Sequence, residues 1–388
     1  MNAPSFIAKR LRFEGKIAMV SIAISFLIMI IAVSVSSGFR REIRSGIASV
    51  SGDIQLTPSD MNYIGEESPI SSTPPGIEEV TALQGVREVK PAIYRAGIVK
   101  KDDIIHGVLF KGVSGQDSLG GLGISVPDRV ASLLGIAEGD DLQAYFVGER
   151  VKVRRFNVRS VYNMPVHADD NPVILASIED MRRLNGWEEG EVSALEVSLE
   201  DSWREAPLMQ AKTDEIGTIV LMHAGEDDDA LVASSLLDKY PQLFDWLNLI
   251  DFNALAVLLL MTVVAGFNMI SGLLILLFRN ISTIGTLKAM GMTDKSISSV
   301  FLRVSSNLVL KGMLIGNAVA LALCAVQSAT HVLKLNPENY FISYVPLKVN
   351  VPMILLADAL AYGVIMLLLL IPTGFISKVD PAVTVRAQ

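Results

Sequence analysis

Cysteine is almost absent from this chain of 388 residues. The single cysteine, Cys324, excludes an internal disulfide, and the four histidines lack the spacing of a Cys/His metal site. The pattern G-x-x-x-x-G-K-[ST], which forms a phosphate-binding loop, is missing as well. No nucleophile and base stand in a recognisable arrangement. The sequence therefore predicts neither an enzyme nor a bound metal or cofactor, so any ATP and Mg²⁺ would be used by a partner protein.

Basic clusters are scarce in the middle of the chain. Residues 45–245 carry a net charge of −17, between flanks of +5 and +4. Nucleic-acid binding requires clustered lysine and arginine to displace counterions, so this pattern argues against a nucleic-acid partner. It also divides the chain into an N-terminal segment with a first membrane helix (1–44), a water-facing α+β domain (45–250) and a membrane domain (251–388).

Charge is nearly missing from four long apolar runs. The chain is 51% hydrophobic and its mean hydropathy is +0.44. A bilayer core needs about 20 apolar residues of helix. Runs of that kind extend from Ile17 to Val35, from Phe252 to Phe278, between Arg303 and Lys334, and between Lys348 and Asp380. We predict an α-helical membrane protein with four transmembrane helices and the α+β domain inserted between helices 1 and 2.

The first run has a basic start and small residues near its end, as a signal peptide has. Its apolar stretch exceeds the usual 7–15 residues, and Arg40 and Arg41 follow it, which favours a retained helix. Short flanks rich in lysine and arginine remain in the cytoplasm. Ten such residues lie on the flanks that include both termini, against six on the opposite flanks. The sequence thus predicts an inner-membrane protein with cytoplasmic termini and a periplasmic domain.

Two ionisable residues interrupt the spans. Lys311 would lie about 10 Å from the cytoplasmic end if its helix begins near Val304, and Asp358 would lie about as deep from the outer end. At such different depths they are not expected to pair. One interpretation is an ion or proton relay; the other, which we favour, is a snorkelling lysine and an interfacial aspartate. Gly312 and Gly316 predict close helix packing.

The water-facing region alternates between strand and helix patterns. Strands are predicted at 86–100, 104–113, 142–147, 151–155, 156–162, 173–176 and 193–199, and helices at 77–84, 127–134, 178–184 and 234–249. We expect strands and short helices on an antiparallel scheme, hence an α+β domain. The acidic loop 226–229 lacks the ligand spacing of a calcium loop.

A short helix is also predicted after the second span, over residues 281–290. Ile284, Leu287 and Lys288 lie at i, i+3 and i+4 and give it an apolar side with a basic neighbour. Gly291 follows as a helix stop, and Thr293 and Asp294 offer a cap for the next helix. Spacing alone leaves two interpretations open, an interfacial turn helix and a docking helix.

Several stretches carry a family resemblance. They read FNMISGLLILLFRNISTIGTLKAMGMTDKSI from Phe267, FIAKRLRF at the start, SSGFRREI after the first span, FNVRSVYNMPVHADDNPVILASIEDMRRLNGW in the middle, and NPENYFISYVPLKVN with SKVDPAVTVR at the end. They closely resemble the permease subunits of lipoprotein-releasing (Lol-type) ABC transporters. The wider family includes FtsX-like and MacB-like proteins that share the four-helix plan.

The resemblance implies roles for three groups of residues. Residues Ile284, Leu287, Lys288, Met290 and Gly291 would belong to a coupling helix that docks on the ATPase subunit. The loop with Pro165, Val166, His167 and Asp169 stands where one subunit type carries a hook for a periplasmic carrier, although it lacks the expected glycine and aromatic residues, and an ordinary loop is the alternative. From helical periodicity, Ile24, Ile28, Ile31, Met261 and Val264 are candidates to line a lipid cavity between paired protomers.

The resulting hypothesis is a permease that extracts lipoproteins from the outer leaflet of the inner membrane and hands them to a periplasmic carrier. Its partners would be a cytoplasmic ABC ATPase dimer, a second permease copy or paralogue, the lipoproteins and membrane lipid. The main alternative is an FtsX-like mechanotransmitter, which passes motion to a periplasmic partner without transport. MacB-like efflux is disfavoured because MacB-like chains carry a fused ATPase domain.

Overall fold

The computed structural model describes residues 16–59, 61, 69–115, 121–148, 150–163, 172–225, 231–336 and 340–378. The chain forms two compact units, each described by itself. The helical unit comprises residues 1–41, 246–335 and 344–388, and the sheet unit comprises residues 42–245 and 336–343. Two long helices, α2 (Lys16–Ser51) and α8 (Pro241–Arg279), carry the chain from one unit into the other.

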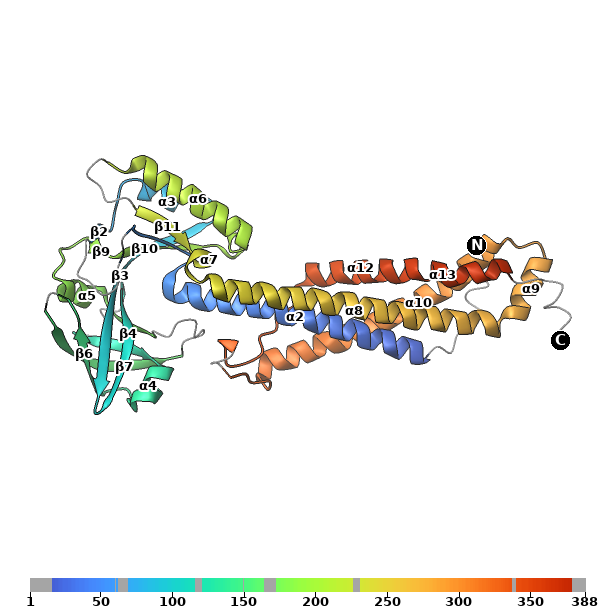
Figure 1. Ribbon diagram of the computed structural model, residues 1–388, viewed down its shortest axis with the longest axis horizontal. Helices are drawn as coiled ribbons and strands as arrows, with labels where there is room; N and C mark the ends of the chain where they lie inside the picture. Colours follow the sequence, from blue (N-terminus) through green and yellow to red (C-terminus); the bar gives the residue numbers. More distant parts are fainter. Residues whose placement is uncertain are drawn as a thin grey trace. The chain divides into compact units, whose positions relative to one another are not determined.

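Within the described residues, four helices are long and apolar enough to cross a membrane. They are α2, α8, α10 (Asp294–Thr330) and α12 (Val351–Leu368), the last continued by α13 (Leu370–Thr373) and the 3₁₀ turn η3 (Gly374–Lys378) (Figure 1). The predicted four-helix class is confirmed. Helix α10 begins well before Val304, because Thr293 occupies its N-cap position. Lys311 therefore lies near the middle of α10, about 25 Å of helix beyond Asp294.

Apolar side chains, aliphatic and aromatic, fill the interior of the bundle. Phe26, Met269, Phe301 and Ile365 are all buried in one cluster. Glycine brings α10 against α2: a Cβ atom at Gly316 would lie 2.3 Å from the carbonyl oxygen of Ala23, and one at Gly312 would lie 2.8 Å from a methyl carbon of Ile22. Only a residue without a side chain permits this approach. The predicted close packing at both glycines is confirmed.

The sheet unit is built on a mixed sheet of nine strands in the order β11-β1-β10-β3-β4-β8-β5-β7-β6. The strands are β1 (Ile54–Pro58), β3 (Val86–Lys101), β4 (Ile104–Val113), β5 (Gly123–Pro127), β6 (Asp141–Phe146), β7 (Lys152–Tyr162), β8 (Val173–Ser177), β10 (Ala194–Leu199) and β11 (Leu231–Ser235). A separate pair joins β2 (Ile70–Ser71) to β9 (Glu191–Val192). The α+β class is confirmed.

The antiparallel scheme needs correction. Strand β4 pairs in parallel with β8, and β5 in parallel with β7. Strand β3 also pairs with β6, so that six strands close into a barrel. Aromatic side chains fill its interior, where the rings of Phe110 and Phe146 lie 4.9 Å apart and those of Phe110 and Phe156 lie 5.2 Å apart. The antiparallel pairing of β3 with β6 leaves no free strand edge at the seam where the barrel closes.

The sheet unit also contains helices of 3 to 18 residues. They are α3 (Ile77–Ala82), α4 (Asp128–Leu134), α5 (Ile178–Asn185), the 3₁₀ turn η2 (Asp201–Trp203), α6 (Ala206–His223) and α7 (Leu236–Lys239). Residues 234–249, predicted as one helix, instead contain the end of β11, α7 and the start of α8. The break occurs because Ser235 caps α7 through a reciprocal hydrogen-bond pair with Asp238 and because Pro241 opens the next helix.

Candidate functional site

The short helix predicted after the second span is present as α9 (Ile281–Ala289). Met290 ends it, and Gly291 adopts a left-handed backbone with a φ of +88°. Lys288 forms an ion pair with Asp294, 2.9 Å apart, which ties α9 to the first turn of α10. The α9–turn–α10 corner is therefore held by a charged contact in addition to the backbone turn.

The predicted coupling residues do not share one surface. Ile284 is only 1% exposed and belongs to the interior of the bundle, and Leu287 packs against the same cluster. Met290, by contrast, is 78% exposed. The apolar side that the sequence assigned to docking thus points into the chain's own bundle, because those side chains are needed to bury α9. The exposed residues of α9 and of the turn that follows it are Thr283, Thr286, Ala289, Met290 and Gly291.

The five candidate cavity residues also differ in their exposure, so they do not form one surface. Ile24 and Val264 are exposed on α2 and α8, and Ile28 is half-buried. Ile31 and Met261 pack against interior clusters of the helical unit. Within a single chain, Ile24 and Val264 are therefore the candidates with the most surface left for lipid. The predicted carrier-binding residues Pro165, Val166, His167 and Asp169 lie outside the described residues.

A buried polar network lies in the sheet unit, at the end of α2, and the sequence predictions missed it. Lys111, on β4, forms an ion pair with Glu196 of β10 at 2.7 Å, with side-chain exposures of 5% and 8%. The hydroxyl of Tyr94 donates a hydrogen bond to the same carboxylate and accepts one from Gln55 at 2.9 Å. Burial lowers the pKa of Lys111, while the nearby Glu196 carboxylate opposes that shift. The sequence did contain a signal for this network, because a lysine inside the apolar run VLFKGV requires a polar or acidic partner when the strand is buried.

We call this group of residues the junction network (Gln55, Tyr94, Lys111, Glu196 and Lys239). It contacts the C-terminal end of α2, and it includes the last residue of α7, which precedes α8. Lys111 donates to the carbonyl oxygen of Val50 at 2.5 Å, and Gln55 donates to that of Ser51 at 2.9 Å. Both are carbonyls of the last turn of α2, which have no partner within the helix. Lys239, the last residue of α7 before α8, donates to Gln55 at 3.0 Å.

Asp53 adds a second attachment directly after α2. It is fully buried, and its carboxylate accepts hydrogen bonds from the backbone N–H of Leu199 at 2.8 Å and from Arg204 at 3.0 Å. Its carbonyl oxygen accepts one from the N–H of Leu236, 3.1 Å away, at the start of α7. Burial raises the pKa of Asp53, and these two donors oppose the shift. Asp53 therefore links the segment that follows the C-terminal end of α2 to the start of α7, the helix that precedes α8.

In the helical unit, Asp358 is 6% exposed and accepts a hydrogen bond from Asn317 at 2.6 Å. Its side chain is thus buried between α10 and α12, while its depth relative to the membrane interface stays a prediction. Lys311 is exposed, in agreement with the expectation that these two residues do not pair. Asn317 was missed, although an asparagine in an apolar run of helix usually has a polar neighbour.

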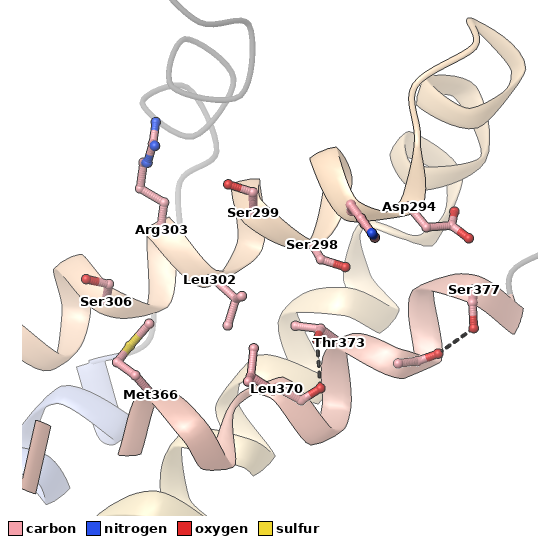
Figure 2. Close-up of a pocket in the computed structure, with 12 residues that line it drawn as sticks. Asp294, Ser298, Ser299, Leu302, Arg303, Ser306, Met366, Leu370, Thr373 and Ser377 are labelled. Atoms are coloured by element: carbon pink, nitrogen blue, oxygen red, sulfur yellow. Dashed lines mark hydrogen bonds between the residues drawn. The ribbon is translucent and has the colours of Figure 1, made fainter. Parts of the chain in front are cut away.

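A shallow pocket of about 590 Å³ lies between the first half of α10 and the end of the last span. Leu302, Met366 and Leu370 turn toward one another across it, whereas Ser299 and Arg303 extend from the rim (Figure 2). Its remaining lining residues are Asp294, Lys295, Ser298, Ser306, Thr373, Gly374 and Ser377. No group of His, Cys, Asp and Glu suited to a metal occurs in the part of the chain that the structure describes.

Residues 255–381 match the protein family described as FtsX-like permease C-terminal. This part of the chain is an FtsX-like permease domain. It includes most of α8 and all of α9, α10 and α12. The pocket, the Asn317–Asp358 pair and the α9 corner are accordingly features of the permease domain.

The whole chain is similar to proteins named lipoprotein-releasing system transmembrane protein LolC. The one from Neisseria meningitidis serogroup B is 24% identical, over 98% of this chain and 96% of its own length. The one from Xylella fastidiosa is 22% identical, over 97% of this chain and 94% of its own length. The predicted resemblance to Lol-type permeases is confirmed over nearly the full chain.

Two solved structures resemble part of the chain. The periplasmic region of MacB from Actinobacillus actinomycetemcomitans has a TM-score of 0.32 and 9% identity, covering 53% of this chain and 95% of that one. The extracellular domain of the noncanonic ABC-type transporter YknZ from Gram-positive bacteria has a TM-score of 0.30 and 14% identity, and the match covers 47% of this chain and 98% of that one.

Proposed function

We propose that this chain is the permease subunit of an ABC transporter that extracts lipoproteins from the outer leaflet of the inner membrane and hands them to a periplasmic carrier. The similarity to LolC proteins over nearly the whole chain carries this proposal. The family match and these relatives support an ABC permease subunit, and the four apolar helices support a multi-pass inner-membrane location. The ATP and Mg²⁺ are used by a separate ATPase dimer.

Extraction requires an apolar shelter for the lipid. Each buried methylene contributes about 0.8 kcal/mol to membrane anchoring, so two or three acyl chains are held by some tens of kcal/mol. Release through water is therefore prohibitive. Ile24 and Val264, exposed on neighbouring helices, would face a second permease copy or paralogue across a lipid-binding cavity. Ile28 would contribute its half-exposed side chain.

In this proposal both termini and α9 lie in the cytoplasm. The ATPase would bind the exposed side of α9, so that its conformational change moves this helix. Met290 is the apolar anchor there, flanked by Thr283 and Thr286. The ion pair between Lys288 and Asp294 would transmit the motion of α9 to α10. Ile284 and Leu287 would act as the inner side that fixes α9 to the bundle.

The junction network favours a second candidate function, that of an FtsX-like mechanotransmitter without a transported substrate. It fastens the last turn of α2 to β4 and β1, and it fastens Lys239, at the end of α7, to β1. Movement of those helices would thus reach the sheet unit directly, whichever partner it serves. The two candidates differ in their readout, because only a transporter releases acylated protein from vesicles.

The proposal is tested by reconstituting the complex in vesicles with an acylated protein and a carrier, and measuring ATP-dependent release. We expect Met290→Glu to lower release at least about ten-fold, since a charge at a central apolar anchor costs about 2 kcal/mol or more. Met222→Glu is the matched control, because Met222 in the sheet unit is also 78% exposed. Absence of release from the unmodified complex would overturn lipoprotein extraction, and full release with Met290→Glu would overturn docking through α9.

A further inference from the structure

The pocket between α10 and α13 combines an apolar floor with a basic, hydroxyl-rich rim. Leu302, Met366 and Leu370 form the floor (Figure 2). Lys295 and Arg303 supply positive charge at the rim, and within the described residues neither of them forms an ion pair. The side chain of Ser298 adds a hydroxyl donor to the same lining.

The one acidic residue of the pocket does not offset this charge. The carboxylate of Asp294 is paired with Lys288 at 2.9 Å, so the two cancel. The rim therefore keeps a net positive charge from Lys295 and Arg303. The pocket volume of about 590 Å³ falls within the range of roughly 300–1,000 Å³ that holds small ligands.

The lining of the pocket changes from apolar to polar along its length, which suits an amphipathic ligand. Met366 and Leu370 stand near the end of the last apolar span, which reaches Ser377. Ser298 and Lys295 belong to the first turns of α10, before its apolar part. Apolar surface thus passes into polar surface along the length of one pocket, as it does along a phospholipid from acyl chain to headgroup.

We propose that this pocket binds an anionic glycerophospholipid of the cytoplasmic leaflet, with the phosphate at Lys295 and Arg303 and the start of an acyl chain on Leu302 and Leu370. Basic pockets between membrane helices on the cytoplasmic side are suited to anionic headgroups. The leaflet assignment rests on the proposed function, which puts α9 in the cytoplasm. A bound lipid clamps the start of α10 against α13, and through the Lys288–Asp294 pair it steadies α9.

The test uses the purified full chain in detergent, with equal amounts of phosphatidylglycerol and phosphatidylcholine, and measures bound lipid by native mass spectrometry. We expect a preference for phosphatidylglycerol that falls about five-fold for each of Lys295→Gln and Arg303→Gln, because each basic group near an anionic headgroup contributes about 1 kcal/mol. Lys295→Arg retains the preference. Lys334→Gln, which removes an exposed lysine beyond the other end of α10, serves as the control. An unchanged preference in the Lys295→Gln, Arg303→Gln double variant overturns the proposal.

A second arm separates a lipid from free phosphate. Leu370 is half-exposed, so Leu370→Gln leaves folding intact and should weaken phosphatidylglycerol binding by several fold. Displacement of the lipid by millimolar inorganic phosphate, with no effect of Leu370→Gln, would overturn the lipid assignment. No ATP, partner subunit or lipoprotein is present in either arm, so failure here leaves the release experiment unaffected, and failure of release leaves this binding result standing.

Discussion

The helical unit and the sheet unit bury their polar groups in different ways. Toward the middle of the membrane helices the polar contacts are single pairs, such as Asn317 with Asp358, Ser306 with Tyr362 and Asn268 with Ser21. A connected group of Ser36, Arg40, Asn248 and Asp251 occurs only where α2 and α8 adjoin the sheet unit in sequence, as far as the described residues show. In the sheet unit, Lys111, Glu196, Tyr94, Gln55 and Lys239 form one connected network.

This difference suits two mechanical tasks. A single interhelical hydrogen bond contributes about 0.6 kcal/mol on average in a membrane protein, so helices can exchange such pairs as they shift. A buried network has to be kept or lost as a whole, because each member left unpaired in a low dielectric is costly. We therefore interpret the bundle as the deformable part and the junction network as the rigid attachment of α2 and α8.

The largest expected effect comes from breaking the network at the ion pair of Lys111 and Glu196. Lys111→Met leaves the Glu196 carboxylate buried without its cation, which should lower the free energy of unfolding of the sheet unit by about 3–5 kcal/mol. Unfolding in detergent can be followed by tryptophan fluorescence in a Trp246→Phe background, where Trp187 and Trp203 report on the sheet unit.

The matched control removes both charges. Lys111→Met with Glu196→Met leaves no buried charge unpaired, so most of the lost stability should return. A loss below about 1 kcal/mol for Lys111→Met alone would show that the junction network is not a rigid attachment.

An intermediate effect is expected where the helices approach through glycine. Gly316→Ala places a Cβ atom 2.3 Å from the carbonyl oxygen of Ala23, so α10 must move away from α2 at a cost of about 1–3 kcal/mol. Gly363→Ala makes the same change on α12, where nothing lies within 4 Å of the added atom. Thermal unfolding in detergent should separate the two variants, and equal melting temperatures would contradict close packing at Gly316.

The sequence predicted these two regions unequally. The spans and strands β3, β4 and β8 were predicted closely, because long apolar runs and alternating patterns are local signals. Strand β1 was missed: it has only five residues, IQLTP, and ends in a proline. Its partners β10 and β11 are distant in sequence. Strands β5 and β7 pair in parallel through a long connection, which no local pattern announces.

Helix α6 had a readable signal that the prediction passed over. Proline stands in its first turn, and Met209, Ile216 and Val220 repeat at helical spacing. At the candidate site, by contrast, the pattern was recognised but its partner was assigned wrongly. Periodicity correctly gave α9 an apolar side with Ile284 and Leu287, but periodicity cannot say which body covers that side. The bundle of the same chain covers it, and this leaves Met290 as the outward apolar residue.

The smallest expected effect tests the other half of the comparison, a single pair in the bundle. Asn317→Leu removes the donor that contacts Asp358 at 2.6 Å and should destabilise the helical unit by about 1 kcal/mol, since single interhelical hydrogen bonds in membranes contribute at most about 1.7 kcal/mol. Asp358→Asn is the control, because an amide oxygen still accepts a hydrogen bond from Asn317. Thermal unfolding in detergent measures both. A loss for Asn317→Leu as large as that for Lys111→Met would mean that the bundle pair is as rigid an attachment as the network, and the division of mechanical tasks between the two units would fail.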